Sequence, residues 1–267
     1  MPSFEVDGYP ISYAEAGIGE PLVMIHGTLG DQRSFAPQME AFAAKYRVLS
    51  LSMRHTWPGN WQEGGNFTIA RHVEDVAGFI RGMGLGKVRL LGHSRGGHIS
   101  FRIGEKYPEL VRALVLAEPG GELDETLGGV PASGQQAANF ATAAQKIAAG
   151  DIEGGLSEVA ERTGGPGAWG RRAEHRKAIN RDNARTLLGQ MHEDRKPYTR
   201  AAAEAVDIPT LLIGGEKSQP SFGKIMDALE RTMPRTERVT VPNGTHGLNH
   251  DNPEFFNKAV LDFLARH

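Results

Sequence analysis

The sequence predicts an α/β fold: a mostly parallel, doubly wound β-sheet with helices on both faces and a helical insertion. Three observations predict it. Short apolar runs alternate with segments of helical periodicity, which is typical of parallel strands joined by crossover helices. One long stretch, residues 120–206, interrupts that alternation and contains no convincing strand. The chain has 267 residues, which is enough for one large domain with a substantial core.

The predicted strands are apolar runs of four or five residues. They cover residues 22–25, 47–51, 88–91, 113–117, 210–213 and 237–241. Most of these runs end at a glycine or a polar residue. Because the carboxyl ends of parallel strands lie at one edge of a sheet, we expect a ligand site at that edge.

Segments of helical periodicity follow several of the strands. In residues 68–83 an apolar side chain recurs every three or four positions, and Thr68 can cap the first turn. Residues 98–106 and 254–266 are two further predicted helices. Helices in these places would cover both faces of the sheet.

Residues 120–206 are rich in Ala, Gly, Glu and Arg and are predicted to form a helical cap over one end of the sheet. The chain then divides into a sheet domain, residues 1–119 and 207–267, and this cap. Residues 164–167 are mostly glycine and are predicted to form a loop between two helical halves of the cap.

Neither a cofactor nor a metal site is predicted. Gly165, Gly167 and Gly170 match G-x-G-x-x-G, but no strand precedes them and a proline lies among them, so we predict no dinucleotide site. His246 and His250 have a metal-binding spacing, but no third ligand is obvious. The absence of cysteine excludes disulfides, thiolate zinc sites and cysteine nucleophiles.

Charge and hydropathy exclude further classes. A net charge of −2 gives no reason to expect a nucleic acid or an anionic membrane as partner. Charged residues interrupt every apolar stretch before about 18 residues accumulate, so no membrane-spanning helix is predicted. The N-terminus lacks the basic and apolar regions of a signal peptide. We expect a cytoplasmic protein, monomeric or homodimeric, that acts on a small molecule.

Ser94 carries the strongest chemical signal in the chain. It is the serine of a G-x-S-x-G motif that directly follows an apolar strand and directly precedes a predicted helix. A serine on such a sharp strand-to-helix turn is held out from the sheet edge, and the flanking glycines permit the turn. The pattern predicts a serine nucleophile.

A base and two hydrogen-bond donors complete the predicted chemistry. His246 lies in the loop after the last predicted strand, where the base of a Ser-His pair is expected in this type of fold. Residues 26–30 form a glycine-containing turn after the first long strand, and the Thr28 N–H is predicted to bind an oxyanion together with the N–H of Arg95.

These motifs together resemble the α/β-hydrolase superfamily, and the resemblance covers nearly the whole chain. It rests on the His-Gly-x-x-Gly turn at His26, the elbow at Ser94, the helical insertion and His246 before the final helix. The resemblance implies a serine esterase or lactonase with a helical cap. The motifs are specific to the superfamily and not to one substrate.

The acid departs from the usual pattern of that superfamily. In most members an aspartate follows the strand that corresponds to residues 211–213, but Ser218 stands at that position here. Glu118, at the end of the preceding strand, stands where some members carry the acid, including zearalenone-type lactonases. We therefore favour Glu118, with Glu216 as the alternative acid and the absence of either as a third possibility.

The resulting functional hypothesis is hydrolysis of a carboxylic ester or lactone through an acyl-enzyme on Ser94. One alternative is a cofactor-free dioxygenase, C–C hydrolase or lyase on the same fold, in which the serine is not acylated. A second alternative is an inactive small-ligand receptor, which the missing aspartate alone supports.

Several bulky side chains are predicted to contact the substrate. They are Trp57, Trp61, Phe140, Trp169 and Met191. For the two tryptophans of residues 52–61, ordinary packing stays open as an equal alternative. The basic run at residues 171–177 is interpreted as a solvated face rather than as an anion site.

Overall fold

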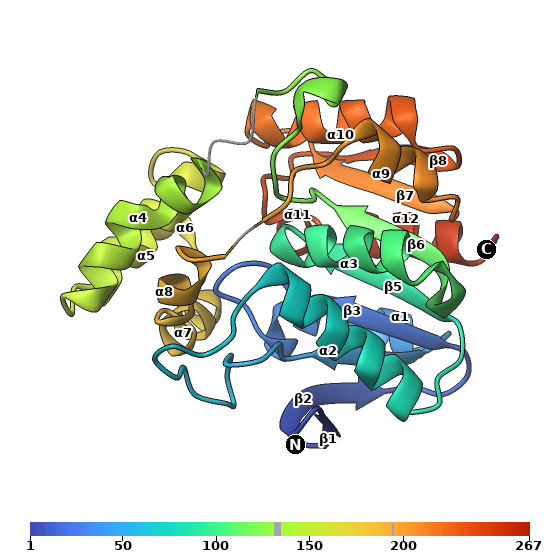
Figure 1. Cartoon of the computed structure of the whole chain (residues 1–267), viewed down its shortest axis with the longest axis horizontal. Coiled ribbons are helices and arrows are strands. Elements are labelled where there is room, and N and C mark those ends of the chain that lie inside the picture. Colours follow the sequence, from blue (N-terminus) through green and yellow to red (C-terminus); the bar gives the residue numbers. More distant parts are fainter. Residues whose placement is uncertain (131–134, 194) are drawn as a thin grey trace.

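The computed structural model describes residues 1–130, 135–193 and 195–267 (Figure 1). A β-sheet of eight strands forms the centre of this described part, in the order β1-β2-β4-β3-β5-β6-β7-β8. The strands are β1 (Ser3–Val6), β2 (Tyr9–Ala16), β3 (Pro21–Ile25), β4 (Arg47–Leu51), β5 (Val88–His93), β6 (Val111–Ala117), β7 (Thr210–Gly215) and β8 (Thr236–Val241). Strands β3 to β8 are parallel, whereas β1 and β2 pair antiparallel.

The parallel strands confirm the six strand predictions. The central strands β3, β6 and β7 are largely apolar because both of their faces are buried, whereas the edge strand β8 is more polar and only partly buried. In β3, Val23 and Ile25 pack into one apolar cluster, and Leu22 and Met24 pack into another on the opposite face.

The hairpin of β1 and β2 is additional to the predicted strands. Its residues alternate between exposed and buried, so its apolar content is lower than that of the central strands. The turn is Asp7-Gly8, with φ of 46° and 71°. An Asp-Gly pair between two alternating segments is a recognised hairpin signal and would have located it.

Helices cover both faces of the sheet, as predicted (Figure 1). One face packs against α2 (Ile69–Gly82), α3 (Arg95–Lys106), α9 (Arg200–Ala205) and α10 (Pro220–Thr232). The other face packs against α1 (Ala36–Ala43), α11 (Leu248–Asp251) and α12 (Pro253–Leu264). The three predicted helices correspond to α2, α3 and α12, and the Thr68 hydroxyl caps α2 by accepting from the Arg71 N–H. Helices α1 and α10 are additional, and each has a proline in its first turn, which is a helix-start signal.

A group of helices between β6 and β7 lies to one side of the sheet (Figure 1). It consists of α4 (Gln135–Ala148), α5 (Ile152–Gly164), α6 (Ala168–Arg171), α7 (Glu174–Asp182) and α8 (Thr186–Gln190). These helices have an apolar cluster of their own, which Leu29 of the sheet domain joins. We call them the helical insertion. Whether the insertion acts as a cap remains a prediction.

The helical insertion is attached to the segment that follows β3. The Asn180 side-chain amide donates to the Leu29 carbonyl, and that of Asn183 donates to the Asp31 carboxylate. None of the helices in the described part of the chain has both the length and the apolar composition needed to span a bilayer.

Candidate active site

Ser94 lies on a sharp turn between β5 and α3, with φ of 55° and ψ of −116°. This positive φ is uncommon for a residue with a side chain. The two glycines of the motif permit the close approach of neighbouring backbone. A Cβ on Gly92 would lie 2.2 Å from the Gly96 carbonyl oxygen, and a Cβ on Gly96 would lie 2.1 Å from that of Ile25. The predicted elbow is therefore present, and its glycines are sterically required.

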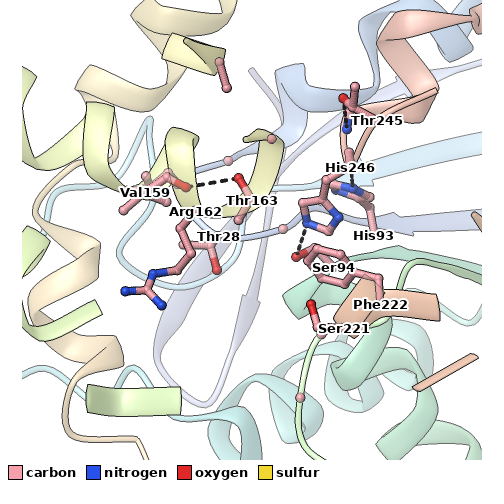
Figure 2. A pocket seen from close by; sticks show the side chains of 18 of the residues that line it. Thr28, His93, Ser94, Val159, Arg162, Thr163, Ser221, Phe222, Thr245 and His246 are labelled. Atoms are coloured by element: carbon pink, nitrogen blue, oxygen red, sulfur yellow. Dashed lines mark hydrogen bonds between the residues drawn. The ribbon is translucent and has the colours of Figure 1, made fainter. Parts of the chain in front are cut away.

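A continuous chain of hydrogen bonds runs from Ser94 through His246 to Glu118. The Ser94 Oγ is 2.9 Å from His246 Nε2, and His246 Nδ1 is 2.7 Å from Glu118 Oε2 (Figure 2). Glu118 is completely buried, and its second carboxylate oxygen accepts from the Gly215 N–H at 2.7 Å. The carboxylate oxygens thus both have partners, which fixes the orientation of the acid and of the imidazole.

Glu118 reaches the histidine because of its own backbone. It follows β6 directly and has φ of 44°, so the chain turns at the strand end. Glu216, the alternative acid, is exposed and accepts instead from the Asn243 backbone N–H at 2.8 Å. Of the two predicted acids, only Glu118 contacts His246 in the structure.

Two further rings lie against the His246 imidazole. Phe222 from α10 stacks on it, with 3.9 Å between ring centroids and 10° between planes. His93 lies 4.8 Å away by centroids, and its Nε2–H donates to the His246 carbonyl oxygen at 2.8 Å. Burial, and secondly the neighbouring His246 imidazole, hold the pKa of His93 well below its usual value. His93 directly precedes the motif serine, so its place near the site could be inferred from the sequence. No pattern in the sequence indicated that Phe222 lies there.

The Thr28 turn faces the same site. The buried His26 ring supports this turn, since its Nδ1–H donates to the Gly27 carbonyl and its Nε2 accepts from the Met53 N–H. Burial lowers the pKa of His26 to about 4, so the ring stays neutral and keeps its acceptor at pH 7. The Thr28 hydroxyl donates to Gln190 Oε1 of the insertion at 3.0 Å.

The backbone N–H groups of Thr28 and Arg95 are available to a ligand. Neither donates to a carbonyl or side-chain acceptor within the described part of the chain. The Arg95 side chain is buried and points elsewhere, with an ion pair to Glu193 at 2.7 Å. Only the Arg95 backbone can therefore serve the site.

A cavity of about 680 Å³ opens beside Ser94, His246 and Thr28. Helix α5 forms part of its far wall, where Figure 2 places Arg162 and Thr163 across from Ser94. Phe140 also lines it, as predicted. This volume lies in the range of ordinary small-molecule sites.

The other four predicted contact residues lie outside this cavity. The Trp57 ring lies under the Arg33 guanidinium, 3.7 Å from its carbon, and Trp61 packs edge-on against Phe67. Trp169 donates from its ring nitrogen to Glu153, and Met191 packs against the apolar cluster of the insertion. None of these four side chains lines the cavity, so their prediction as lining residues was wrong, and for Trp57 and Trp61 the packing alternative holds. Local sequence does not reveal the packing partners that set these orientations.

The interpretation of the basic run as a solvated face is also wrong in part. Arg171, Arg172 and Arg176 line the cavity, whereas His175 and Lys177 do not.

Among the described residues no group of three or more His, Cys, Asp or Glu side chains could hold a metal ion. His250 instead donates to the Ser34 carbonyl oxygen at 2.9 Å.

Comparisons with known proteins agree with this geometry. The family model described as alpha/beta hydrolase fold matches residues 20–253. A putative 2-succinyl-6-hydroxy-2,4-cyclohexadiene-1-carboxylate synthase from Bacillus subtilis is 27% identical, over 97% of this chain and 96% of that protein. A 2-(acetamidomethylene)succinate hydrolase from Mesorhizobium japonicum is 25% identical, over 95% of this chain and 91% of that protein.

Solved structures show the same fold. The enol-lactonase from Burkholderia xenovorans superposes with a TM-score of 0.81 at 18% identity, covering 99% of this chain and all of that one. A thermophilic esterase from Thermogutta terrifontis gives 0.79 at 22% identity, covering 99% and 96%. The family model spans most of the chain. The two solved structures superpose on nearly its full length. The chain therefore belongs to the α/β-hydrolase fold family.

Proposed function

We propose that the protein hydrolyses a carboxylic ester or lactone through an acyl-enzyme on Ser94. The observation that carries this proposal is the hydrogen-bond chain Ser94–His246–Glu118, which opens on a cavity beside two available backbone N–H groups. A nucleophile, a base and a group that orients the base occupy the positions that acyl transfer requires.

In the first step Ser94 Oγ forms a bond to the substrate carbonyl carbon while His246 Nε2 takes the hydroxyl proton. Glu118 holds the proton of Nδ1 and stabilises the imidazolium that forms. The Thr28 and Arg95 N–H groups donate to the oxyanion. When the tetrahedral intermediate collapses, His246 gives its proton to the departing alkoxide, and the acyl group remains on Ser94.

In the second step a water molecule attacks the acyl carbon as His246 takes one of its protons. The bond to Ser94 Oγ then breaks, and Oγ recovers a proton from His246. The products are a carboxylic acid and an alcohol, or a single hydroxy acid from a lactone. No electrons leave or enter, so this chemistry needs no redox cofactor.

Family membership and named relatives support a hydrolytic reaction. A relative from Mesorhizobium japonicum is named as a hydrolase, and a structural neighbour is named as an enol-lactonase. The position of Glu118 weakens the inactive-receptor alternative, since its one support was the missing aspartate at Ser218.

The test is hydrolysis of 4-nitrophenyl butyrate by the wild type, Ser94→Ala, Glu118→Gln and the matched control Glu216→Gln. We expect Glu118→Gln to lower kcat by roughly 10⁴-fold, because the neutral amide neither holds the histidine tautomer nor stabilises its charge. Glu216→Gln should stay within about twofold of the wild type. Equal turnover by Glu118→Gln and the wild type would contradict the assignment of the acid.

A second candidate is a reaction in which Ser94 is not acylated, such as a lyase or C–C bond reaction. The observation in its favour is the Bacillus subtilis relative, which is named as a putative synthase and matches along nearly the whole chain. A fluorophosphonate that forms a covalent adduct on Ser94, detected by mass spectrometry, would favour the hydrolase. A wild type that neither reacts with it nor cleaves esters would favour this second candidate.

A further inference from the structure

Two arginines lie on the wall of the cavity that also contains His246. Arg172 and Arg176, on the segment of α6 and α7, both line the cavity, and each is only partly exposed. The Arg176 guanidinium lies against Gly247, the residue after His246, since a Cβ on Gly247 would be 2.8 Å from Arg176 Nη2. The positive charge of Arg176 is therefore near the reacting groups, and Arg172 lines the same cavity.

Protein groups only partly compensate these two charges. Arg176 faces Asp251 at 3.9 Å, which is beyond hydrogen-bond distance. The other Asp251 oxygen already accepts from both the N–H and the hydroxyl of Thr245. Arg172 donates to the neutral amide oxygen of Asn180 at 2.6 Å, and no described carboxylate lies within 4.0 Å of it. Two guanidinium groups thus share one distant carboxylate.

The remaining cations of the cavity differ from this pair. Arg195 is bound by Glu193, and Arg171 is exposed and donates to the Pro166 carbonyl. Arg162 and Lys224 are also exposed, so water solvates them. The pair of Arg172 and Arg176 is the one whose charge is both partly buried and incompletely neutralised by the described residues.

Burial of like charges is unfavourable unless an anion accompanies them. Burial, and secondly the neighbouring Arg176, lower the pKa of Arg172 to about 10, and burial also lowers the pKa of Arg176. Both groups remain protonated at neutral pH. An anion between them would offset the repulsion, and a guanidinium pair presents several N–H donors to a carboxylate.

We propose that Arg172 and Arg176 bind a carboxylate of the substrate, so that the ester or lactone cleaved at Ser94 is an anion. This proposal rests on the hydrolase function proposed above and adds the substrate class. The two arginines and Asp251 carry one net positive charge, which matches one carboxylate better than a phosphate dianion. Asn180 joins the site to the Thr28 turn, because it accepts from Arg172 and donates to the Leu29 carbonyl.

The first experiment compares two esters of equal chain length, mono-4-nitrophenyl adipate and 4-nitrophenyl hexanoate. The acyl chain of the adipate ester ends in a carboxylate, and that of the hexanoate ester ends in a methyl group. We expect the wild type to have a higher kcat/KM for the adipate ester. Arg172→Gln and Arg176→Gln should each lower kcat/KM for the adipate ester by about 10- to 100-fold, and much less for the hexanoate ester. The loss should appear mainly in KM.

The matched control is Lys177→Gln, which removes one positive charge from α7 at a side chain that does not line the cavity. This variant should have the same kcat/KM as the wild type for both esters. Equal losses for the two esters in Arg172→Gln and Arg176→Gln would mean that these arginines only hold the insertion in place. That result, or a wild type without preference for the adipate ester, would overturn the proposal.

A binding measurement separates this proposal from the hydrolase function. Calorimetric titration of the wild type with adipamate and with hexanamide needs no turnover. Tighter binding of adipamate, lost in Arg176→Gln, would support the carboxylate site even if neither ester were cleaved, in which case only the hydrolase function would fail. Equal binding of the two amides, or stronger competition against adipamate by inorganic phosphate than by acetate, would overturn the carboxylate assignment.

Discussion

The sheet edge and the helical insertion contribute to the site in different ways. At the sheet edge, Ser94, Glu118 and Leu29 all have positive φ, so the backbone itself determines where their side chains and amides point. In the described part of the insertion, residues with positive φ are glycines, and long side chains such as Arg172 and Arg176 reach the cavity. At the edge the backbone conformation orients the reacting groups, whereas the insertion contributes groups at the ends of long side chains.

This difference predicts different tolerance to substitution. Backbone strain persists only where surrounding structure enforces it, and it concentrates at functional sites. Changes at the sheet edge should therefore damage folding and chemistry together. Changes in the insertion should alter which substrates bind and leave the fold intact.

The largest expected effect on stability is at the sheet edge. Gly96→Ala would place a Cβ 2.1 Å from the Ile25 carbonyl oxygen, so α3 must move away from β3. We expect the free energy of unfolding to fall by about 3 kcal/mol, as overpacking of a tight contact does. Gly170→Ala in α6 is the control, because its Cβ would meet nothing within 4 Å. Urea unfolding of both variants measures the difference, and equal stabilities would contradict the account.

Acid should destabilise the protein through the buried histidines of the sheet domain. His26 has a pKa of about 4 in the folded protein, below the unfolded value, so the unfolded chain binds more protons as the pH falls. The contribution of neutral His26 to the free energy of unfolding is complete above about pH 6.5 and is lost as the pH falls towards 4. Between pH 7 and pH 5 this histidine alone should lower the free energy of unfolding by about 2 kcal/mol. The buried His72, His93 and His98, whose pKa values burial also lowers, act in the same direction.

Urea unfolding at several pH values checks this prediction. His26→Gln should reduce the slope of the unfolding free energy against pH, because it removes a side chain whose pKa burial lowers in the folded protein. An unfolding free energy that is flat between pH 7 and pH 5 would be inconsistent with buried neutral histidines.

The contact between the two regions should have a smaller effect. Thr28→Val removes the hydroxyl that donates to Gln190 and keeps the shape of the side chain. We expect kcat for 4-nitrophenyl butyrate to fall about fivefold, which corresponds to the loss of roughly 1 kcal/mol in positioning the Thr28 N–H. Steady-state kinetics measures it. A change in KM alone would mean that the turn is held without the insertion.

The smallest effect is expected from Trp169→Phe. This ring lies outside the cavity, and Arg172, Lys177 and Arg181 lie near its face. Phenylalanine keeps an aromatic face for these cations. Its kcat/KM should stay within about twofold of the wild type, whereas Phe140→Ala, at a cavity-lining residue, should raise KM. The reverse order would show that substrate contacts extend beyond the cavity.

The same contrast explains what could be predicted from the sequence. The elbow at Ser94 needs small residues two positions away on each side, and Glu118 follows a strand whose end is plain in the apolar pattern. Such local requirements can be read residue by residue. Phe222 and Arg176 reach the site only through the packing of α10 and of the insertion. Because many partners decide those orientations, local periodicity did not reveal them.

The most direct test of the central claim is whether Ser94 carries the acyl group during turnover. The wild type is mixed with excess 4-nitrophenyl butyrate, quenched in acid within the first turnovers, digested and analysed by mass spectrometry. The account predicts a butyryl group on the peptide that contains Ser94, and no such group in Ser94→Ala. Sustained release of nitrophenol by the wild type with no acylated peptide, or equal release by Ser94→Ala, would contradict it.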